Sequence, residues 1–76
     1  MYKTANGKIL YQVVYETKEK NTDGNWAPLD SRHEELKNIV PRLDRYTLDY
    51  ANLHFRARIV DTAISKKTYL YSTISY

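Results

Sequence analysis

Apolar and polar positions alternate most regularly in the segment 8–18. The segment is rich in β-branched and aromatic residues and holds neither glycine nor proline. One face carries Ile9, Tyr11, Val13 and Tyr15, and the other carries Leu10, Gln12, Val14 and Glu16. Because both faces include apolar groups, we expect a central strand in a sheet, with Tyr11 and Tyr15 in the core.

A second alternating pattern runs through "LHFRARIVDT", residues 53–62. Leu53, Phe55, Ala57 and Ile59 fall on one side, and His54, Arg56 and Arg58 fall on the other. The segment 68–76, "TYLYSTISY", also alternates, with Leu70, Ser72 and Ile74 opposite Tyr69, Tyr71 and Thr73. The stretch "ISKK" lies near the turn between the two. We expect residues 53–60 and 68–75 to form an antiparallel pair.

Turn signals separate the remaining strands. Asn6-Gly7 is typical of a type I′ hairpin, in which both turn residues have φ > 0, and it would join a short strand near residues 2–4 to the segment 8–18. Asp23-Gly24 indicates a second turn. Trp26 would begin a short return strand that ends before Pro28.

Helical spacing replaces alternation between residues 31 and 50. Ser31 and Glu34 have the spacing of a capping box, which predicts a helix starting at Ser31. Leu36, Ile39, Val40, Leu43, Tyr46, Thr47 and Tyr50 continue an apolar stripe. Pro41 interrupts it, so we expect either a kinked helix or a second helix beginning near Pro41.

The order of elements predicts a small α+β domain. It reads strand, strand, helix, strand, strand, with an extra short strand at the N-terminus. One antiparallel sheet with this ββαββ-like order and a helix on one face is the simplest architecture. The 76 residues form a single domain, 1–76, because nothing in them has the composition of a linker.

Composition narrows the setting and the class of partner. The chain has no cysteine, which excludes disulfides and thiolate chemistry and favours a reducing, cytoplasmic setting. It has no run of 18 apolar residues, so we expect no membrane segment. The net charge is +3, and residues 53–76 carry all of it, with four basic residues against Asp61. A local basic patch favours an anionic partner, although a total of +3 is small for a dedicated nucleic-acid binder.

Motifs for catalysis are weak. His33-Glu34-Glu35 resembles part of a metalloprotease helix, but the second histidine would fall at position 37, which is lysine. Gly7 and Gly24 are the only two glycines, and both sit in turns, so no phosphate-binding loop exists. We therefore expect neither an enzyme nor a metal site or cofactor.

The basic and aromatic residues of the C-terminal hairpin are the better candidates for a binding site. They are His54, Arg56, Arg58, Lys66, Lys67, Tyr69 and Tyr71. Arginine and tyrosine are enriched at protein–protein hot spots, and they also stack bases and hold phosphates in single-stranded nucleic acids. A third reading is structural, with the arginine stems covering the sheet while their charged heads stay in water.

The last strand is also a candidate edge for pairing with a second chain. The segment 68–76 contains neither charge nor proline and has high β propensity. Its candidate contact residues are Thr68, Tyr69, Leu70, Tyr71, Thr73 and Tyr76. We expect either a homodimer or strand addition to a partner protein through this segment.

The layout resembles that of small proteins found in bacteriophage and mobile-element genomes. The residues that carry the resemblance are Gly24, Trp26, Glu34, Glu35, Arg58, Ile59, Val60 and Asp61. The resemblance covers most of the chain, but the helical region is longer here and Pro41 departs from the pattern. It implies a small protein that binds and inhibits a host or defence protein, and it brings no catalytic residue.

Overall fold

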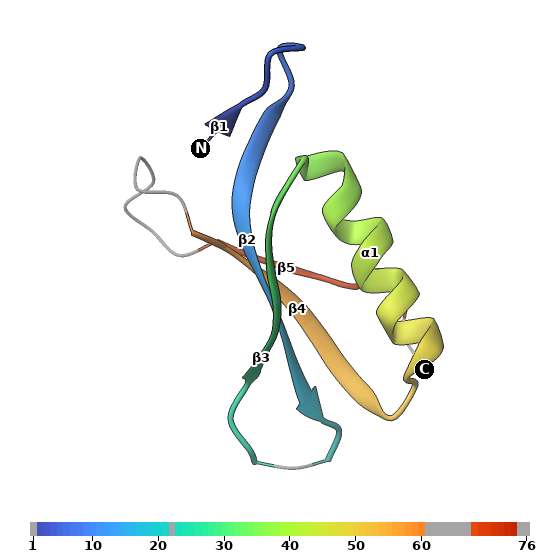
Figure 1. Cartoon of the computed structure of the whole chain (residues 1–76). Helices are drawn as coiled ribbons and strands as arrows, with labels where there is room; N and C mark the ends of the chain where they lie inside the picture. The colour runs from blue at the N-terminus through green and yellow to red at the C-terminus, as the bar shows by residue number, and fades with distance from the viewer. Residues whose placement is uncertain (1, 22, 61–67, 75–76) are drawn as a thin grey trace.

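The structure is a computed structural model that describes residues 2–21, 23–60 and 68–74. The elements in these residues are the strands β1 (Tyr2–Lys3), β2 (Ile9–Glu19), β3 (Ala27–Glu34), β4 (Leu53–Val60) and β5 (Thr68–Tyr71), and the helix α1 (Leu36–Asp49). The strands form one antiparallel sheet along the path β1-β2-β4-β5, and β3 pairs with the other side of β2 (Figure 1). The predicted α+β architecture is confirmed.

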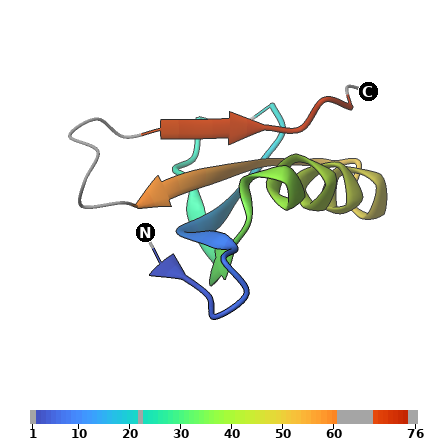
Figure 2. The same ribbon diagram turned by 90° about the horizontal axis from the view of Figure 1, so that it is seen from above.

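Strand β2 is the centre of the sheet, as its pattern predicted. It pairs with β3 from Tyr11 to Thr17 and with β4 from Gln12 to Glu19. Figure 2 shows β5, β4 and β2 following one another across the sheet, with α1 on one side. Because β3 and β4 both pair with β2 along most of its length, the register of β2 determines which side chains of all three strands face α1 and which face away from it.

The core lies between the sheet and α1. Its buried side chains are Val13, Tyr15, Ile39, Leu43, Phe55, Ala57 and Ile59, and Tyr11, Tyr46, Leu53 and Leu70 pack against them. The helical stripe and the alternation in β2 and β4 therefore point to the same layer. Tyr15 is fully buried and Tyr11 only partly, so both take the core-side position that the alternation predicted.

The hairpin between β1 and β2 forms, but its turn is not type I′. Thr4 N–H donates to Lys8 O at 2.9 Å, and Gly7 N–H donates to Thr4 O at 3.0 Å. Gly7 has φ 81°, while Asn6 is not among the described residues with positive φ. These features fit a three-residue loop in which only Gly7 takes the left-handed conformation.

Strand β3 is longer than its sequence predicted. It runs from Ala27 through Pro28 to Glu34, so Pro28 lies inside the strand and Trp26 lies before it. Tyr15 pairs with Asp30 and Glu16 pairs with Pro28, which leaves Leu29 as an extra residue at a β-bulge. Proline is tolerated here because β3 is an edge strand and a bulge already interrupts the ladder.

The predicted capping box at Ser31 is wrong. Ser31 and Glu34 belong to β3, and α1 begins at Leu36 with Glu35 as an N-cap that makes no side-chain cap bond. Pairing with β2 holds residues 31–34 in an extended conformation, and the Glu34 carboxylate accepts a hydrogen bond from Arg42 of the helix. Tertiary contacts therefore outweigh the local cap signal.

Helix α1 is a single helix that contains Pro41. The helical character predicted on both sides of Pro41 is confirmed, and no second helix starts there. Its buried residues are Ile39, Leu43 and Thr47. Pro41 is exposed, so the backbone bond that it removes lies on the solvent side of the helix.

The predicted pairing of the C-terminal hairpin is confirmed, although β5 is shorter than residues 68–75. Arg56 pairs with Tyr71 and Ile59 pairs with Thr68. The strand ends after Tyr71 because the next residues bind the helix. Asp44 accepts hydrogen bonds from Ser72 Oγ and from Thr73 N, each at 2.8 Å, and from Thr73 Oγ1 at 2.8 Å.

Candidate binding face

The sheet face opposite α1 gathers most of the predicted binding residues, and we call it the open face. Its positions alternate with the buried residues of each strand. Its main members are Val14, Glu16, Lys18, Trp26, His54, Arg56, Arg58, Tyr69 and Tyr71. The structure therefore brings five of the seven predicted residues together, and Lys66 and Lys67 lie outside the described residues.

Arg56 is held inside the open face rather than presented to solvent. Its Nε donates to Glu16 Oε1 at 2.9 Å, and its side chain is only 18% exposed. Its guanidinium lies 4.4 Å from the ring centroid of Trp26 and 4.4 Å from that of Tyr69. Glu16 is buried, so Arg56 neutralises a buried carboxylate while stacking between two rings.

Arg58 lies beside the same carboxylate but holds it less tightly. Its Nε is 3.8 Å from Glu16 Oε1, and its side chain is 30% exposed. Glu16 thus offsets one of the two arginine charges. The contacts of Arg56 support a structural role, in which its side chain covers the sheet. Arg58 and the exposed His54 stay accessible to a ligand.

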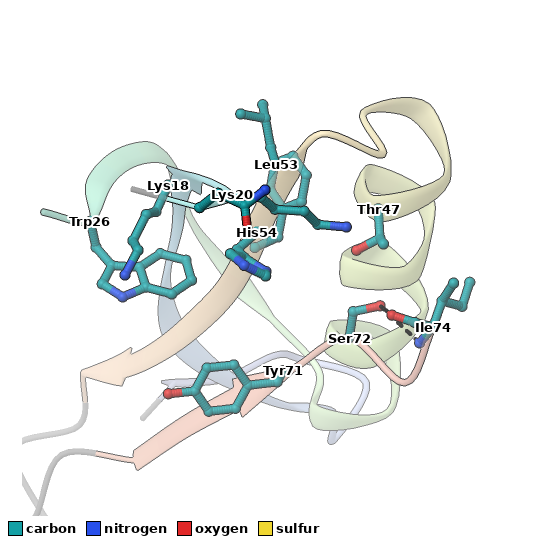
Figure 3. A pocket seen from close by; sticks show the side chains of 11 residues that line it. Lys18, Lys20, Trp26, Thr47, Leu53, His54, Tyr71, Ser72 and Ile74 are labelled. Atoms are coloured by element: carbon teal, nitrogen blue, oxygen red, sulfur yellow. Dashed lines mark hydrogen bonds between the residues drawn. The ribbon is translucent and has the colours of Figure 1, made fainter. Parts of the chain in front are cut away.

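A hollow opens beside these residues where β5 ends, and we call it the Trp26 hollow. Its volume is about 530 Å³, and its lining includes Lys18, Lys20, Trp26, His54, Tyr71 and Ser72. Figure 3 shows Trp26 and Lys18 at one side, Thr47 and Ile74 at the other, and His54 and Tyr71 between them. Among the described residues that line it there is neither aspartate nor glutamate.

The hollow exists because β5 leaves the sheet early. After Tyr71 the chain turns to Asp44 on α1, so β5 pairs with β4 only from Arg56 to Ile59. Leu53 and Phe55, at the start of β4, keep β2 as a partner on one side and border the hollow on the other. The attachment of residues 72–74 to the helix therefore shapes this site.

The hydrogen bonds at Asp44 also change its acidity. Donation from Ser72 and Thr73 lowers the pKa of the Asp44 carboxyl below its ordinary value. The carboxylate is therefore charged at neutral pH and holds the segment 72–74 against α1. Because Thr73 N–H is used in this contact, Thr73 does not offer its amide to a second chain as the sequence had suggested.

The other predicted edge residues have different surroundings in β5. The Leu70 side chain packs against the core, while Tyr71 is 54% exposed. Thr68 lies at the start of the strand opposite Ile59. Tyr76 lies outside the described residues. Within β5, Tyr71 is therefore the residue with an exposed side chain, and Tyr69 is half-buried.

A second polar cluster lies under the helix. Arg42 donates from Nε to Glu34 Oε2 and from its terminal nitrogen to Glu34 Oε1, each at 3.1 Å. Tyr15 Oη donates to Glu34 Oε2 at 3.4 Å. Burial and the Glu34 carboxylate raise the pKa of Tyr15, and the bond to Glu34 raises the pKa of Arg42. These groups join α1 to β3, and two hydrogen bonds to Glu34 hold the Arg42 guanidinium in place.

Sequence reasoning missed Glu16, Lys18, Lys20 and Trp26 as members of this face. The signal was present for β2, because Glu16, Lys18 and Lys20 continue the alternation that begins at Gln12. Trp26 could not be placed in the same way, since the connection from β2 carries its own irregular conformation, with φ 61° at Asn21.

Three further findings bear on function. The described residues hold no cluster of three histidine, cysteine, aspartate or glutamate side chains suited to a metal ion. None of the helices in the described part of the chain is long and apolar enough to cross a membrane. No family model, curated protein or solved structure matches the chain.

Proposed function

We propose that this chain is a non-catalytic binding protein that occupies the surface of a partner protein through β5 and the neighbouring part of the open face. The observation that carries the proposal is the outer edge of β5. In the described residues β5 ends the path of the sheet, and its sequence "TYLY" has no charge or proline to discourage pairing.

The hydrogen-bonding pattern identifies the groups that face outward. Lys20 N–H donates to Asn52 O at 3.3 Å, in register with the β2–β4 pairing. In an antiparallel ladder, hydrogen-bonded pairs alternate with non-bonded pairs. Ala57 therefore directs its amide and carbonyl toward Leu70 of β5, and the corresponding groups of Tyr69 and Tyr71 point away from the sheet.

The side chains around this edge fit a protein contact. Tyr71 is 54% exposed, and Arg58 lies beside Tyr69 in the neighbouring strand. Tyrosine and arginine supply much of the binding energy at protein interfaces. A strand added to β5 would gain main-chain hydrogen bonds from the edge and side-chain contacts from the tyrosines. A protein acting in this way inhibits or regulates its partner by covering a surface, and the phage-like layout favours a host or defence protein as that partner.

Two substitutions at Tyr71 separate the backbone from the side chain. Tyr71→Pro removes the outward N–H and leaves the β4–β5 bonds of Leu70 in place, whereas Tyr71→Thr removes only the ring. The immobilised protein is exposed to nuclease-treated bacterial lysate, and captured bands are identified by cross-linking and mass spectrometry. We expect one band that wild type captures, Tyr71→Thr captures weakly and Tyr71→Pro loses, while circular dichroism of all three proteins is the same. Equal capture by Tyr71→Pro would contradict strand addition.

A second candidate function is the binding of single-stranded nucleic acid, and the Trp26 hollow favours it. Lys18 and Lys20 supply positive charge beside the Trp26 and Tyr71 rings, and His54 also lines the hollow. Binding would then weaken with salt, with a log–log slope of about −0.7 for each phosphate neutralised. A titration of a mixed-sequence single strand at low salt tests this function, and the absence of binding removes it.

A further inference from the structure

We infer that the Trp26 hollow is a binding site for one nucleoside phosphate, with the base against an aromatic side chain and the phosphate on the lysines. This inference is independent of strand addition at β5. It deepens the second candidate function, because a nucleoside phosphate is both a free metabolite and the repeating unit of a nucleic acid.

The charge of the hollow selects an anion. Lys18, Lys20 and His54 line it, and no acidic side chain of the described residues does so. The lining of the hollow thus carries two lysines and no carboxylate among the described residues, which favours an anionic ligand.

The aromatic walls select a flat ring. The Trp26 ring centroid lies 4.4 Å from the Arg56 guanidinium and 5.8 Å from Lys18 Nζ, so the ring and this lysine stand next to each other at the hollow. Tyr71 is 54% exposed, and it lines the hollow on another side (Figure 3). Stacking of a base on such rings is worth about 1–3 kcal/mol in proteins that bind single strands. A ligand that uses both the rings and the cations must carry an aromatic ring system and a negative charge together.

Size and residue types favour a nucleoside phosphate over a phosphorylated peptide. The volume of about 530 Å³ lies within the range of about 300–1,000 Å³ that is usual for small-molecule sites. Proteins that recognise phosphorylated peptides use clusters of arginine. The described residues that line the hollow include no arginine, whereas lysine serves as a point-charge partner for phosphate in nucleotide sites.

Trp26 provides a direct readout, because it is the single tryptophan of the chain. Adenosine 5′-monophosphate is titrated into the full-length protein at about 50 mM salt, and Trp26 fluorescence is followed. We expect saturable quenching. Lys18→Gln should weaken binding by about three- to tenfold, because one charge-assisted contact is lost. Lys37→Gln is the matched control, since its side chain is 76% exposed on α1 and contacts Glu35 instead of the hollow. It should change affinity by less than about twofold.

Several ligands then test each element of the inference. Adenosine and ribose 5-phosphate each lack one recognised group, and both should bind more weakly than the nucleotide. An equal affinity for ribose 5-phosphate would overturn the stacking role of Trp26. A stronger response to phosphotyrosine than to the nucleotide would overturn the ligand class, and so would no saturable quenching up to about 1 mM nucleotide. Equal loss in Lys18→Gln and Lys37→Gln would show non-specific attraction and would overturn the site.

Short oligonucleotides distinguish the two sources of the ligand. Tighter binding of a short oligodeoxyadenylate than of the mononucleotide, with the same Lys18→Gln loss, would support the hollow as one subsite of a nucleic-acid surface. Mononucleotide binding with no gain for the oligonucleotide would support the hollow as a site for a free nucleotide, and the second candidate function would then fail. Oligonucleotide binding that is insensitive to Lys18→Gln, without mononucleotide binding, would overturn the inference and leave that function standing.

Discussion

Each face of the sheet buries a glutamate against an arginine, but the two pairs connect different elements of the fold. Under α1, Glu34 accepts two bonds from Arg42 and joins the helix to an edge strand. On the open face, Glu16 accepts one bond from Arg56 and joins the two central strands. A buried carboxylate requires such a partner in either place. The difference is that the pair on the open face consumes an arginine that would otherwise be offered to a ligand.

The largest effect that this comparison predicts is the loss of Arg42. Arg42→Ala leaves Glu34 buried without its two-bond partner, and Arg32, 3.9 Å from Glu34, is already bonded to Asp30 at 2.9 Å. We expect a loss of about 3 kcal/mol in the free energy of unfolding. Urea denaturation, followed by circular dichroism, measures it. Since the variant could fail to fold, the double variant Glu34→Gln with Arg42→Met is the control and should regain much of the loss. A single variant of wild-type stability would show that the pair contributes little.

Arg56→Ala should destabilise the fold less than Arg42→Ala. It removes one hydrogen bond and two ring contacts, but Arg58 already lies 3.8 Å from Glu16 and can move toward it. We expect a loss of about 2 kcal/mol, against about 0.5 kcal/mol for Arg58→Ala. Urea denaturation of both single variants and of the double variant measures the coupling. Strict additivity would contradict the sharing of Glu16 by the two arginines.

Alkaline pH should lower the stability of the fold through Tyr15, which lies on the sheet face packed against α1. Its pKa is raised in the folded state, so its neutral form contributes stability below about pH 10, the ordinary pKa of tyrosine. This contribution is lost as the pH rises above that value, because the unfolded chain releases the proton first. We expect stability to fall between about pH 10 and 11 in the wild type and to fall less steeply in Tyr15→Phe. Parallel pH profiles would contradict this assignment.

The smallest expected effect is at Ser31. In the structure it is an exposed residue of β3 whose Oγ accepts a bond from Gln12 Nε2 at 2.7 Å, so Ser31→Ala should change stability by less than about 0.5 kcal/mol. A helix N-cap at the same position would cost about 1 kcal/mol when replaced. Thermal melts distinguish the two values, and a loss near the larger one would favour a helix that starts at Ser31.

The elements that the sequence predicted well depend on local periodicity. The alternation in 8–18 and 53–60 and the stripe around Leu43 each give a face without reference to distant residues, and the structure confirms them. Ser31 was misassigned because its pairing with Val14 of β2, which decides the conformation there, cannot be inferred from the neighbouring residues. The spacing of Ser31 and Glu34 does match a capping box, but the chain forms a strand there.

The site was predicted less completely for the same reason. The alternation placed His54, Arg56 and Arg58 on one face, which the structure shows. It could not show that Glu16, 40 residues earlier, lies against Arg56. Nor could it show that the bonds from Thr73 to Asp44 end β5 and open the hollow, because these groups are 29 residues apart.

The central position of β2 also has a consequence for the folding reaction. Its hairpin with β3 closes a short loop, whereas its pairing with β4 must wait until α1 and the following turn have formed, since Glu16 and Arg56 are 40 residues apart. Contacts between distant residues form late because loop closure costs entropy. Until β4 arrives, one edge of β2 is exposed along "YQVVY", a segment of high β propensity. During synthesis and refolding, aggregation of this chain should therefore begin at β2, and conditions that speed the docking of β4 should improve its yield.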